Sequence, residues 1–231
     1  MKICIDPGHG GNDEGVQAFG LLEKNITLDI AVKLKNFLEQ EGVEVVLTRE
    51  KDETVELKDR IGIINESGAN YIISIHCNSG HVSDKGAETI YKHGSEEGEE
   101  LANNILKEIS KLEISSRRAY YKLNAQRDDY FLLTREANPV SVIVEVAFIT
   151  NPSDNHLLSQ NSYRKKIANA IAIGVFHTMN INKQKAHWAQ KHFSRMKESG
   201  IVVEDHPLDS KVTWGELSMV ISRLMDRLGK K

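Results

Sequence analysis

Cysteine, proline and aromatic residues are scarce in this chain. Its 231 residues include two cysteines and four prolines, and aromatic residues make up 6% of the total. Two cysteines cannot form the disulfide framework of a small secreted domain, and we expect Cys4 and Cys77 to be free thiols buried in strands. No stretch approaches about 18 consecutive apolar residues, so we expect no membrane insertion.

Strong charge of either sign is also missing. The formal net charge is −3, and the sequence has no arginine-rich arm or long basic stripe, so nucleic acid is not expected as a partner. The charge is nevertheless unevenly divided. Lys and Arg outnumber Asp and Glu by 10 to 6 in residues 182–231, whereas residues 1–181 hold 20 against 27. A basic tail on an acidic body indicates either attraction to a polyanionic surface or an ordinary solvated face.

The chain does contain a regular alternation of apolar strands and amphipathic helices. Short apolar runs predict strands at residues 2–5, 43–47, 71–75, 87–91, 130–133 and 141–148. Apolar residues at helical spacing predict helices at residues 25–41, 54–68, 96–112 and 163–179. The βαβαβ beginning is typical of an α/β fold, and we expect a mainly parallel twisted sheet of about six strands flanked by helices.

The length and the pattern of elements predict two domains. Residues 1–181 hold all the expected strands and enough apolar residues for one core. Residues 180–186 are rich in Lys, Asn and Gln and indicate a linker. Residues 182–231 are expected to form a small helical C-terminal domain, with helices at 188–199 and 214–228. So short a segment lacks an independent core and needs to dock, dimerise or bind something.

Two of the expected strands lead into a histidine, His9 after the first strand and His76 after the third. Ligands of α/β sheets bind beyond the carboxyl ends of the strands, so both side chains are placed where a metal site would form. A hydrolytic zinc site needs three protein ligands and one open position, and Glu23 at the start of the first helix is the candidate third ligand. Three other acids compete with it by proximity alone: Asp6, Asp13 and Glu14. Asp6 could instead hold the loop or orient His9. The alternative to a metal site is that each histidine is an ordinary packed residue.

Glu145 is a carboxylate inside the apolar strand expected at residues 141–148. Burial raises the pKa of a carboxyl group and suits it to act as a general base near neutral pH. The alternative is a structural glutamate paired with an arginine, for which Arg127 and Arg135 are the candidates.

The glycine-rich turn Asp6–Gly11 could also be interpreted as a phosphate cradle. It lacks the Lys-Ser/Thr ending of a P-loop and the spacing of a dinucleotide-binding fingerprint. We therefore interpret its glycines as allowing the backbone to approach a metal and a bulky substrate closely.

Four motifs follow one another within residues 1–180. They are Asp6-Pro7-Gly8-His9-Gly10-Gly11, Leu22-Glu23-Lys24, Ser74-Ile75-His76-Cys77-Asn78 and Val144-Glu145-Val146-Ala147-Phe148-Ile149-Thr150-Asn151. Together they resemble the zinc-dependent N-acetylmuramoyl-L-alanine amidases of the third amidase type. The resemblance implies that His9, Glu23 and His76 bind one Zn²⁺ ion and that Glu145 is the catalytic acid. Cys77 and Val146-Ala147 depart from the residues usual in that family, and neither departure touches a ligand.

The resemblance implies hydrolysis of the amide bond between N-acetylmuramic acid and L-alanine in peptidoglycan, and hence lysis of the bacterial cell wall. Zinc would activate a bound water, and Glu145 would take its proton and return it to the leaving amine. The segment Tyr130–Arg135 resembles the family's cleft lining, and we expect Asn78 and Arg127 to bind substrate. The alternatives are another zinc peptidase acting on the peptide stem and a catalytically silent wall-binding protein.

The tail carries a weaker likeness. His187-Trp188-Ala189, Gly200-Ile201 and Val212–Glu216 resemble one degenerate S-layer-homology motif, which implies binding of a secondary cell-wall polymer through residues 182–231. Met1 leads directly into a strand without the features of a signal peptide, so we expect synthesis in the cytoplasm and action at the wall after holin-dependent release or lysis. A bacteriophage endolysin is the leading interpretation, and a bacterial autolysin would share these features.

Overall fold

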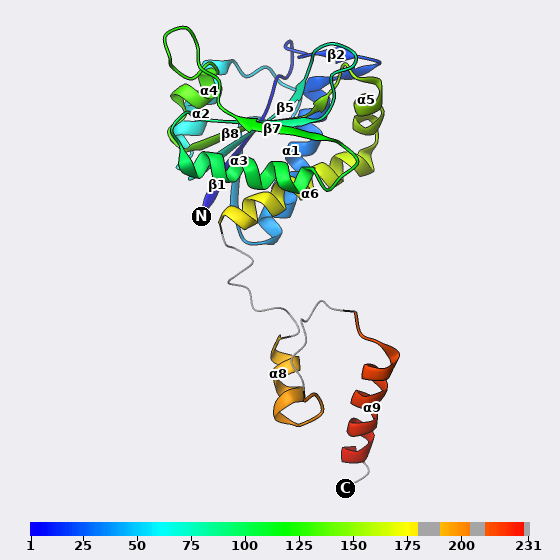
Figure 1. Ribbon diagram of the computed structural model, residues 1–231. Coiled ribbons are helices and arrows are strands. Elements are labelled where there is room, and N and C mark those ends of the chain that lie inside the picture. Colours follow the sequence, from blue (N-terminus) through cyan, green and yellow to red (C-terminus); the bar gives the residue numbers. More distant parts are fainter. Residues whose placement is uncertain (180–189, 204–210, 229–231) are drawn as a thin grey trace. The chain divides into compact units, whose positions relative to one another are not determined.

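The computed structural model describes residues 1–179, 190–203 and 211–228. The chain forms two compact units, Met1–Met179 and Asn180–Lys231, and each is described by itself (Figure 1). The expected linker at residues 180–186 and the motif residues His187, Trp188 and Ala189 lie outside the described residues.

The first unit is built on a six-stranded sheet with the strand order β4-β1-β5-β8-β6-β7. Its strands are β1 (Lys2–Pro7), β4 (Glu44–Leu47), β5 (Tyr71–Asn78), β6 (Ala87–Tyr91), β7 (Ser116–Tyr120) and β8 (Val140–Phe148). The strands β4, β1, β5 and β8 run parallel, β6 runs antiparallel to β8, and β7 runs parallel to β6. The short strands β2 (Gln17–Ala18) and β3 (Leu21–Leu22) form a separate hairpin. The expected α/β fold with a mainly parallel sheet is therefore confirmed.

Helices cover both faces of the sheet. The helix α6 (Asn161–Thr178) packs against α1 (Glu23–Gln40) and α3 (Glu96–Ile109), and α1 and α3 pack against the strands on one face (Figure 1). On the other face, α2 (Leu57–Glu66) and α4 (Leu132–Glu136) bury their apolar residues against the strands. The helix α5 (Pro152–Ser159) follows β8 and precedes α6.

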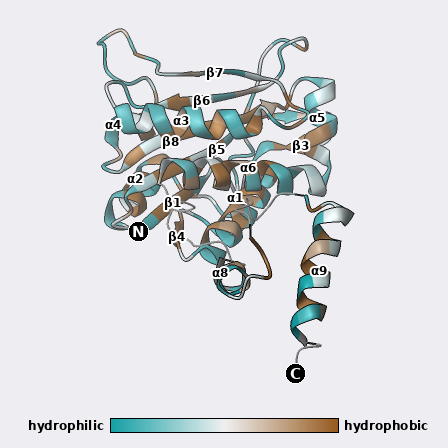
Figure 2. Ribbon diagram, turned by 60° about the horizontal axis from the view of Figure 1, so that its bottom comes forward, coloured by the Kyte–Doolittle hydropathy of each residue, from teal (hydrophilic) through white to brown (hydrophobic). Residues whose placement is uncertain are grey.

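The helix α3 shows how local sequence defines a helix in this fold. The Ser95 hydroxyl accepts a hydrogen bond from the Gly98 amide at 3.0 Å and so caps the first turn. Acidic residues in that turn and a lysine in the last turn complement the helix dipole. Its apolar residues Leu101, Ile105 and Ile109 are buried, and Figure 2 shows hydrophobic and hydrophilic residues alternating along the helix. These signals lie within α3 itself, so the sequence predicts its position well.

One expected strand is wrong. Residues 130–133 do not form a strand but lead into α4, and the sixth strand is instead β7. Leu133 is buried in the apolar cluster shared by α2, α4 and the sheet, so the short apolar run marks a buried helical turn. An apolar run of four residues fits either element, which periodicity alone cannot separate. The strand β7 has the sequence Ser-Arg-Arg-Ala-Tyr and lies at the sheet edge, where exposed polar residues hide the strand pattern.

The face covered by α2 and α4 changes from apolar to ionisable toward the carboxyl ends of the parallel strands. Ile72 and Ile143 belong to the buried apolar cluster on this face. Because side chains on a strand alternate between faces, His76 and Glu145 lie on the same face as these isoleucines. The functional candidates therefore sit at the end of the core, where the strands stop and a substrate has access.

The second unit contains two described helices, α8 (Gln190–Glu198) and α9 (Trp214–Leu228). Large apolar side chains of α9 are exposed, and they are Trp214, Leu217, Met219, Ile221, Leu224 and Met225. In the described parts of the chain, none of the helices has the length and apolar character needed to cross a membrane.

Candidate active site

The loop after β1 is held from two distant parts of the chain. The buried Asp6 carboxylate accepts hydrogen bonds from the Ser74 hydroxyl at 2.7 Å and from Arg60 Nη1 at 2.8 Å. Arg60 also donates to the carbonyl oxygens of Pro7, at 2.6 Å, and of His9. Arg49 donates to the Pro7 carbonyl at 3.1 Å and to the Gly8 carbonyl at 3.0 Å. This clamp holds His9 in a left-handed backbone conformation, with φ of 61°.

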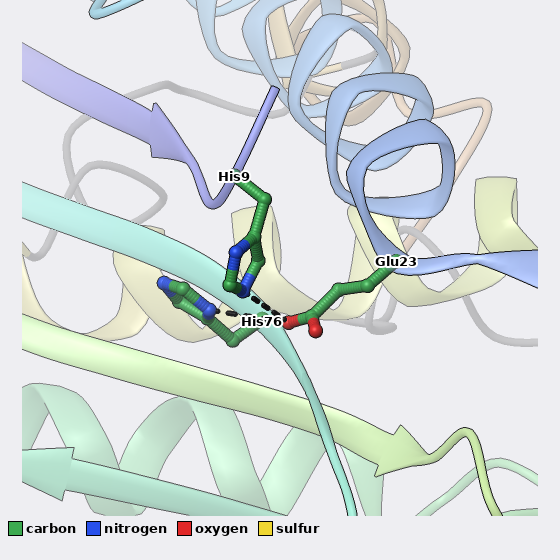
Figure 3. Close-up of side chains that lie close together, drawn as sticks. All are labelled: His9, Glu23 and His76. Carbon is green, nitrogen blue, oxygen red and sulfur yellow. Dashed lines mark hydrogen bonds and ion pairs between the residues drawn. The ribbon is translucent and has the colours of Figure 1, made fainter. Parts of the chain in front are cut away.

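Three side chains converge beside this loop, and they come from different elements (Figure 3). His9 follows β1, Glu23 begins α1, and His76 lies near the end of β5. Glu23 Oε1 lies 3.2 Å from His9 Nε2 and 3.2 Å from His76 Nδ1. The two imidazole rings meet edge to face, with centroids 5.0 Å apart. The structure thus brings together the three residues predicted as metal ligands.

Each member of this triad is oriented by further hydrogen bonds. Glu23 accepts from the Val16 amide through Oε2 and from the Cys77 amide through Oε1, both at 2.9 Å. His9 Nδ1 lies 2.9 Å from the Asp13 carboxylate. Burial by itself would raise the pKa of Glu23, but its bonds to the histidines and to the amide hold that pKa well below the usual range.

The three acids that compete with Glu23 as the third ligand do not join the triad. Asp13 orients His9 from the far side of the ring, as carboxylates commonly do for metal-bound imidazoles. Asp6 holds the loop through Arg60 and Ser74, which was one of its two expected roles. Glu14 is exposed.

The triad fits a zinc ion. Two imidazoles and one carboxylate are a common donor set of hydrolytic zinc sites, which leave a fourth position for water. Ligand atoms about 2.0–2.1 Å from a tetrahedral ion lie about 3.3 Å apart, close to the 3.2 Å between Glu23 Oε1 and each imidazole nitrogen. Across the described ranges, no other three His, Cys, Asp or Glu residues offer ligand atoms that meet in this way.

Glu145 is the neighbour of His76 on the adjacent strand β8. Its Oε2 atom is buried and has no hydrogen-bond partner among the described residues. Burial raises the pKa of Glu145 to about 7, helped by the nearby Glu23 and Glu88 carboxylates and opposed by His76. A carboxyl group with such a pKa can both accept and donate a proton near neutral pH.

The two arginines considered as structural partners of Glu145 are engaged or placed elsewhere. Arg135 Nη1 donates to the Asp129 carbonyl at 2.8 Å. Arg127 is an exposed turn residue with φ of 67°. No described contact connects Arg127 with the triad, so its expected role in substrate binding stays a prediction.

Sequence reasoning missed Glu88, which lies opposite Glu145 on β6. Its buried carboxylate accepts from Asn78 Nδ2 at 3.0 Å and from Arg117 Nε at 2.9 Å. Asn78, predicted to bind substrate, is thus used at least partly to hold Glu88. An acid inside the apolar run Ala87–Tyr91 is the same signal that singled out Glu145, so the sequence did contain it.

A cavity of about 310 Å³ opens beside His9 and His76. Its lining combines ionisable groups near the triad with Phe131 and with apolar side chains of α2, α4 and β8, among them Leu57, Leu133 and Ile143. The segment Tyr130–Arg135 is expected to line the cleft, and its residues Phe131, Leu132 and Leu133 line this cavity. The site can therefore hold a substrate group of appreciable size next to the triad.

Comparison with known proteins agrees with this arrangement. The model of the N-acetylmuramoyl-L-alanine amidase family matches residues 3–177. The chain belongs to this family.

Individual amidases are similar to about three quarters of this chain. The germination-specific N-acetylmuramoyl-L-alanine amidase of Bacillus subtilis is 33% identical over 190 residues, which cover 75% of this chain and 77% of that protein. The amidase AmiC2 of Nostoc punctiforme has 33% identity and a TM-score of 0.71, covering 78% of this chain and 97% of that structure. The CwlD amidase of Clostridioides difficile, solved in complex with the GerS lipoprotein, has 31% identity and a TM-score of 0.72, covering 78% and 98%.

Proposed function

We propose that this amidase hydrolyses the bond between N-acetylmuramic acid and L-alanine in peptidoglycan with one Zn²⁺ ion held by His9, Glu23 and His76. Glu145 is the catalytic acid and base. One observation carries the proposal: two imidazole nitrogens and one carboxylate oxygen meet at 3.2 Å, beside a buried carboxyl group that has an unpartnered oxygen. Membership of the amidase family supplies the bond that is cleaved.

The residues of the site have different roles in the reaction. When bound, zinc lowers the pKa of a water molecule and polarises the scissile carbonyl. Glu145 takes a proton from the attacking water, whose oxygen adds to the carbonyl carbon, and returns that proton to the alanine nitrogen as the C–N bond breaks. Burial raises the pKa of Glu145, which suits this carboxyl group to both transfers. Asp13, Arg49 and Arg60 keep His9 in place.

The test is digestion of purified peptidoglycan followed by mass spectrometry. We expect free amino groups on L-alanine, loss of this activity with a chelator, and recovery on adding Zn²⁺. Glu145→Gln should lower the rate by about 10²- to 10⁴-fold while one equivalent of zinc still binds. The control Glu66→Gln removes an exposed carboxylate at the end of α2 and should leave the rate unchanged.

Each alternative gives a different result. New termini within the stem peptide would identify a peptidase and contradict the amidase assignment. Full activity of Glu145→Gln would remove Glu145 from the mechanism. Zinc binding without turnover on any peptidoglycan would favour a silent wall-binding protein.

For the second unit we propose binding to a secondary cell-wall polymer. The support is the exposed apolar surface of α9, including Trp214 at 83% exposure, together with the basic excess of residues 182–231. Removal of residues 182–231 should reduce sedimentation with cell walls without changing cleavage of soluble muropeptides. Unchanged sedimentation would refute this role. A small membrane protein encoded beside the gene would identify a phage endolysin rather than a bacterial autolysin.

A further inference from the structure

A row of ionisable side chains crosses the sheet from the triad to its edge. His76 on β5 is in register with Glu145 on β8, Glu145 with Glu88 on β6, and Glu88 with Arg118 on β7. Register partners on neighbouring strands share a face of the sheet. The row therefore extends from the triad to the edge strand β7 on the face where the substrate reacts.

An irregularity in β7 brings two arginines to the end of this row. Ala87 pairs with Ser116, but the next residue, Glu88, pairs with Arg118, so Arg117 is an extra residue on β7. Such a bulge lets two consecutive side chains oppose one residue of the partner strand. Both arginines reach the buried Glu88 carboxylate through Nε, Arg117 at 2.9 Å and Arg118 at 3.3 Å.

The two guanidinium groups are held in place but remain accessible. The guanidinium of Arg117 lies 5.0 Å from the centre of the Phe148 ring, and that of Arg118 lies 4.1 Å from the centre of the Tyr120 ring. The side chains are 39% and 62% exposed. Each guanidinium has five N–H donors, and the contacts with Glu88 use the Nε donor of each. Paired, partly exposed arginines in fixed positions are suited to bind a carboxylate.

The cavity on the other side of the histidines is less suited to a carboxylate. Arg60 lines it, but its nitrogens donate to Asp6 and to the carbonyl oxygens of Val55, Pro7 and His9. The carboxylates of Asp13 and Glu56 belong to residues that line the same cavity. An anionic substrate group would meet like charges there, whereas the β7 edge offers two guanidinium groups, with Asp84 Oδ1 4.0 Å from Arg117 Nη1.

We propose that Arg117 and Arg118 form a subsite for a carboxylate of the peptide stem. This inference rests on the proposed function. The arginines reach back to β6, two strands from β5, so their Nε groups lie about 10 Å from the triad strand. An extended peptide advances about 3.3 Å per residue, so a carboxylate on the side chain of the second stem residue lies within reach of the subsite. The stem then crosses β8 and β6 toward the sheet edge, and the muramoyl group faces the cavity.

The experiment compares two synthetic N-acetylmuramoyl tripeptides with an amidated C-terminus that differ only in a free carboxylate or a carboxamide on the second stem residue. The intact chain loaded with zinc should cleave the carboxylate form with a kcat/KM at least about tenfold higher, since charge-assisted hydrogen bonds are the strong ones. Arg118→Gln and Arg117→Gln should each raise KM for the carboxylate form by about tenfold, with little change in kcat. The double variant should treat both substrates alike.

Controls separate binding from folding. Lys107→Gln removes an exposed charge on α3 and should keep the preference of the native chain. Arg118→Lys keeps the charge without the planar fork and should retain part of the preference. Melting temperatures report folding, and if Arg117→Gln is unstable, the more exposed Arg118 provides the test.

The remaining outcomes overturn the subsite in distinguishable ways. Equal cleavage of both substrates at the muramoyl–alanine bond by the native chain would refute the subsite and leave the proposed function intact. Variants that lower kcat equally on both substrates would show that the arginines act only through Glu88. Cleavage of neither substrate, or of another bond, would refute the proposed function and the subsite with it.

Discussion

Replacing Arg60 by methionine tests whether His9 is held in place from α2. Arg60 is 5% exposed and pairs with the buried Asp6 carboxylate at 2.8 Å. Removing one partner of a buried ion pair costs about 3–5 kcal/mol. Asp6 keeps its hydrogen bonds from the Thr48 and Ser74 hydroxyls, so we expect the lower end, about 3 kcal/mol. The same change frees the Pro7 and His9 carbonyls, and we expect zinc to bind about 10- to 100-fold more weakly.

Two measurements on the intact chain check this expectation. Urea unfolding of the metal-free protein gives the loss in free energy of unfolding, and competition with a chromogenic chelator gives the zinc affinity. Lys58→Met changes an exposed residue of the same helix and should alter stability by less than about 0.5 kcal/mol. Native stability and zinc affinity in Arg60→Met would refute the clamp. Lost stability with native zinc affinity would show that Arg60 supports the fold without positioning His9.

Three further predictions concern the same loop and strand ends. A Cβ atom at Gly8 would collide with the His76 ring, so Gly8→Ala should weaken zinc binding. In the control Gly62→Ala on α2, the added Cβ meets nothing within 4 Å and should stabilise the helix slightly. Equal zinc affinities of the two variants, measured by chelator competition, would contradict the expected collision. Burial opposes ionisation of Asp6, but Arg60, Thr48 and Ser74 lower its pKa below 3.8. Its contribution to stability is therefore complete above the unfolded pKa and is lost as the pH falls through the folded value. In urea unfolding, Asp6→Asn should therefore lose less stability than the native chain as the pH falls below about 4. Asp13→Asn should weaken zinc binding by about 10-fold with little loss of stability, because Asp13 is exposed and orients one ring.

The sequence predicts the triad because each ligand has a local signal. His9 and His76 follow apolar strands, and Glu23 opens an amphipathic helix, so strand ends and helix starts can be read without knowing the contacts between them. The arginines that hold the loop have no such signal. Arg49 and Arg60 contact the loop from more than 40 residues away, and nothing in their own neighbourhood distinguishes them from surface arginines. The bulge in β7 cannot be predicted from the sequence either, because it exists only in the pairing of β7 with β6.

Glu88 and Glu145 show how a paired buried acid differs from an unpaired one in this fold. Both are carboxylates within apolar strands and both are in register on the same face, but only Glu145 belongs to a motif of the family. Glu88 is compensated by two arginines and an asparagine, all of which approach from other strands. Glu145 lies between Glu88 and the triad and keeps a buried oxygen without a partner among the described residues. An uncompensated buried carboxyl group is costly to ionise, which is the property a proton-transferring residue needs near neutral pH. The difference between the two acids therefore lies in cross-strand pairing, because Arg117 and Arg118 pair with Glu88, whereas Glu145 Oε2 has no partner among the described residues.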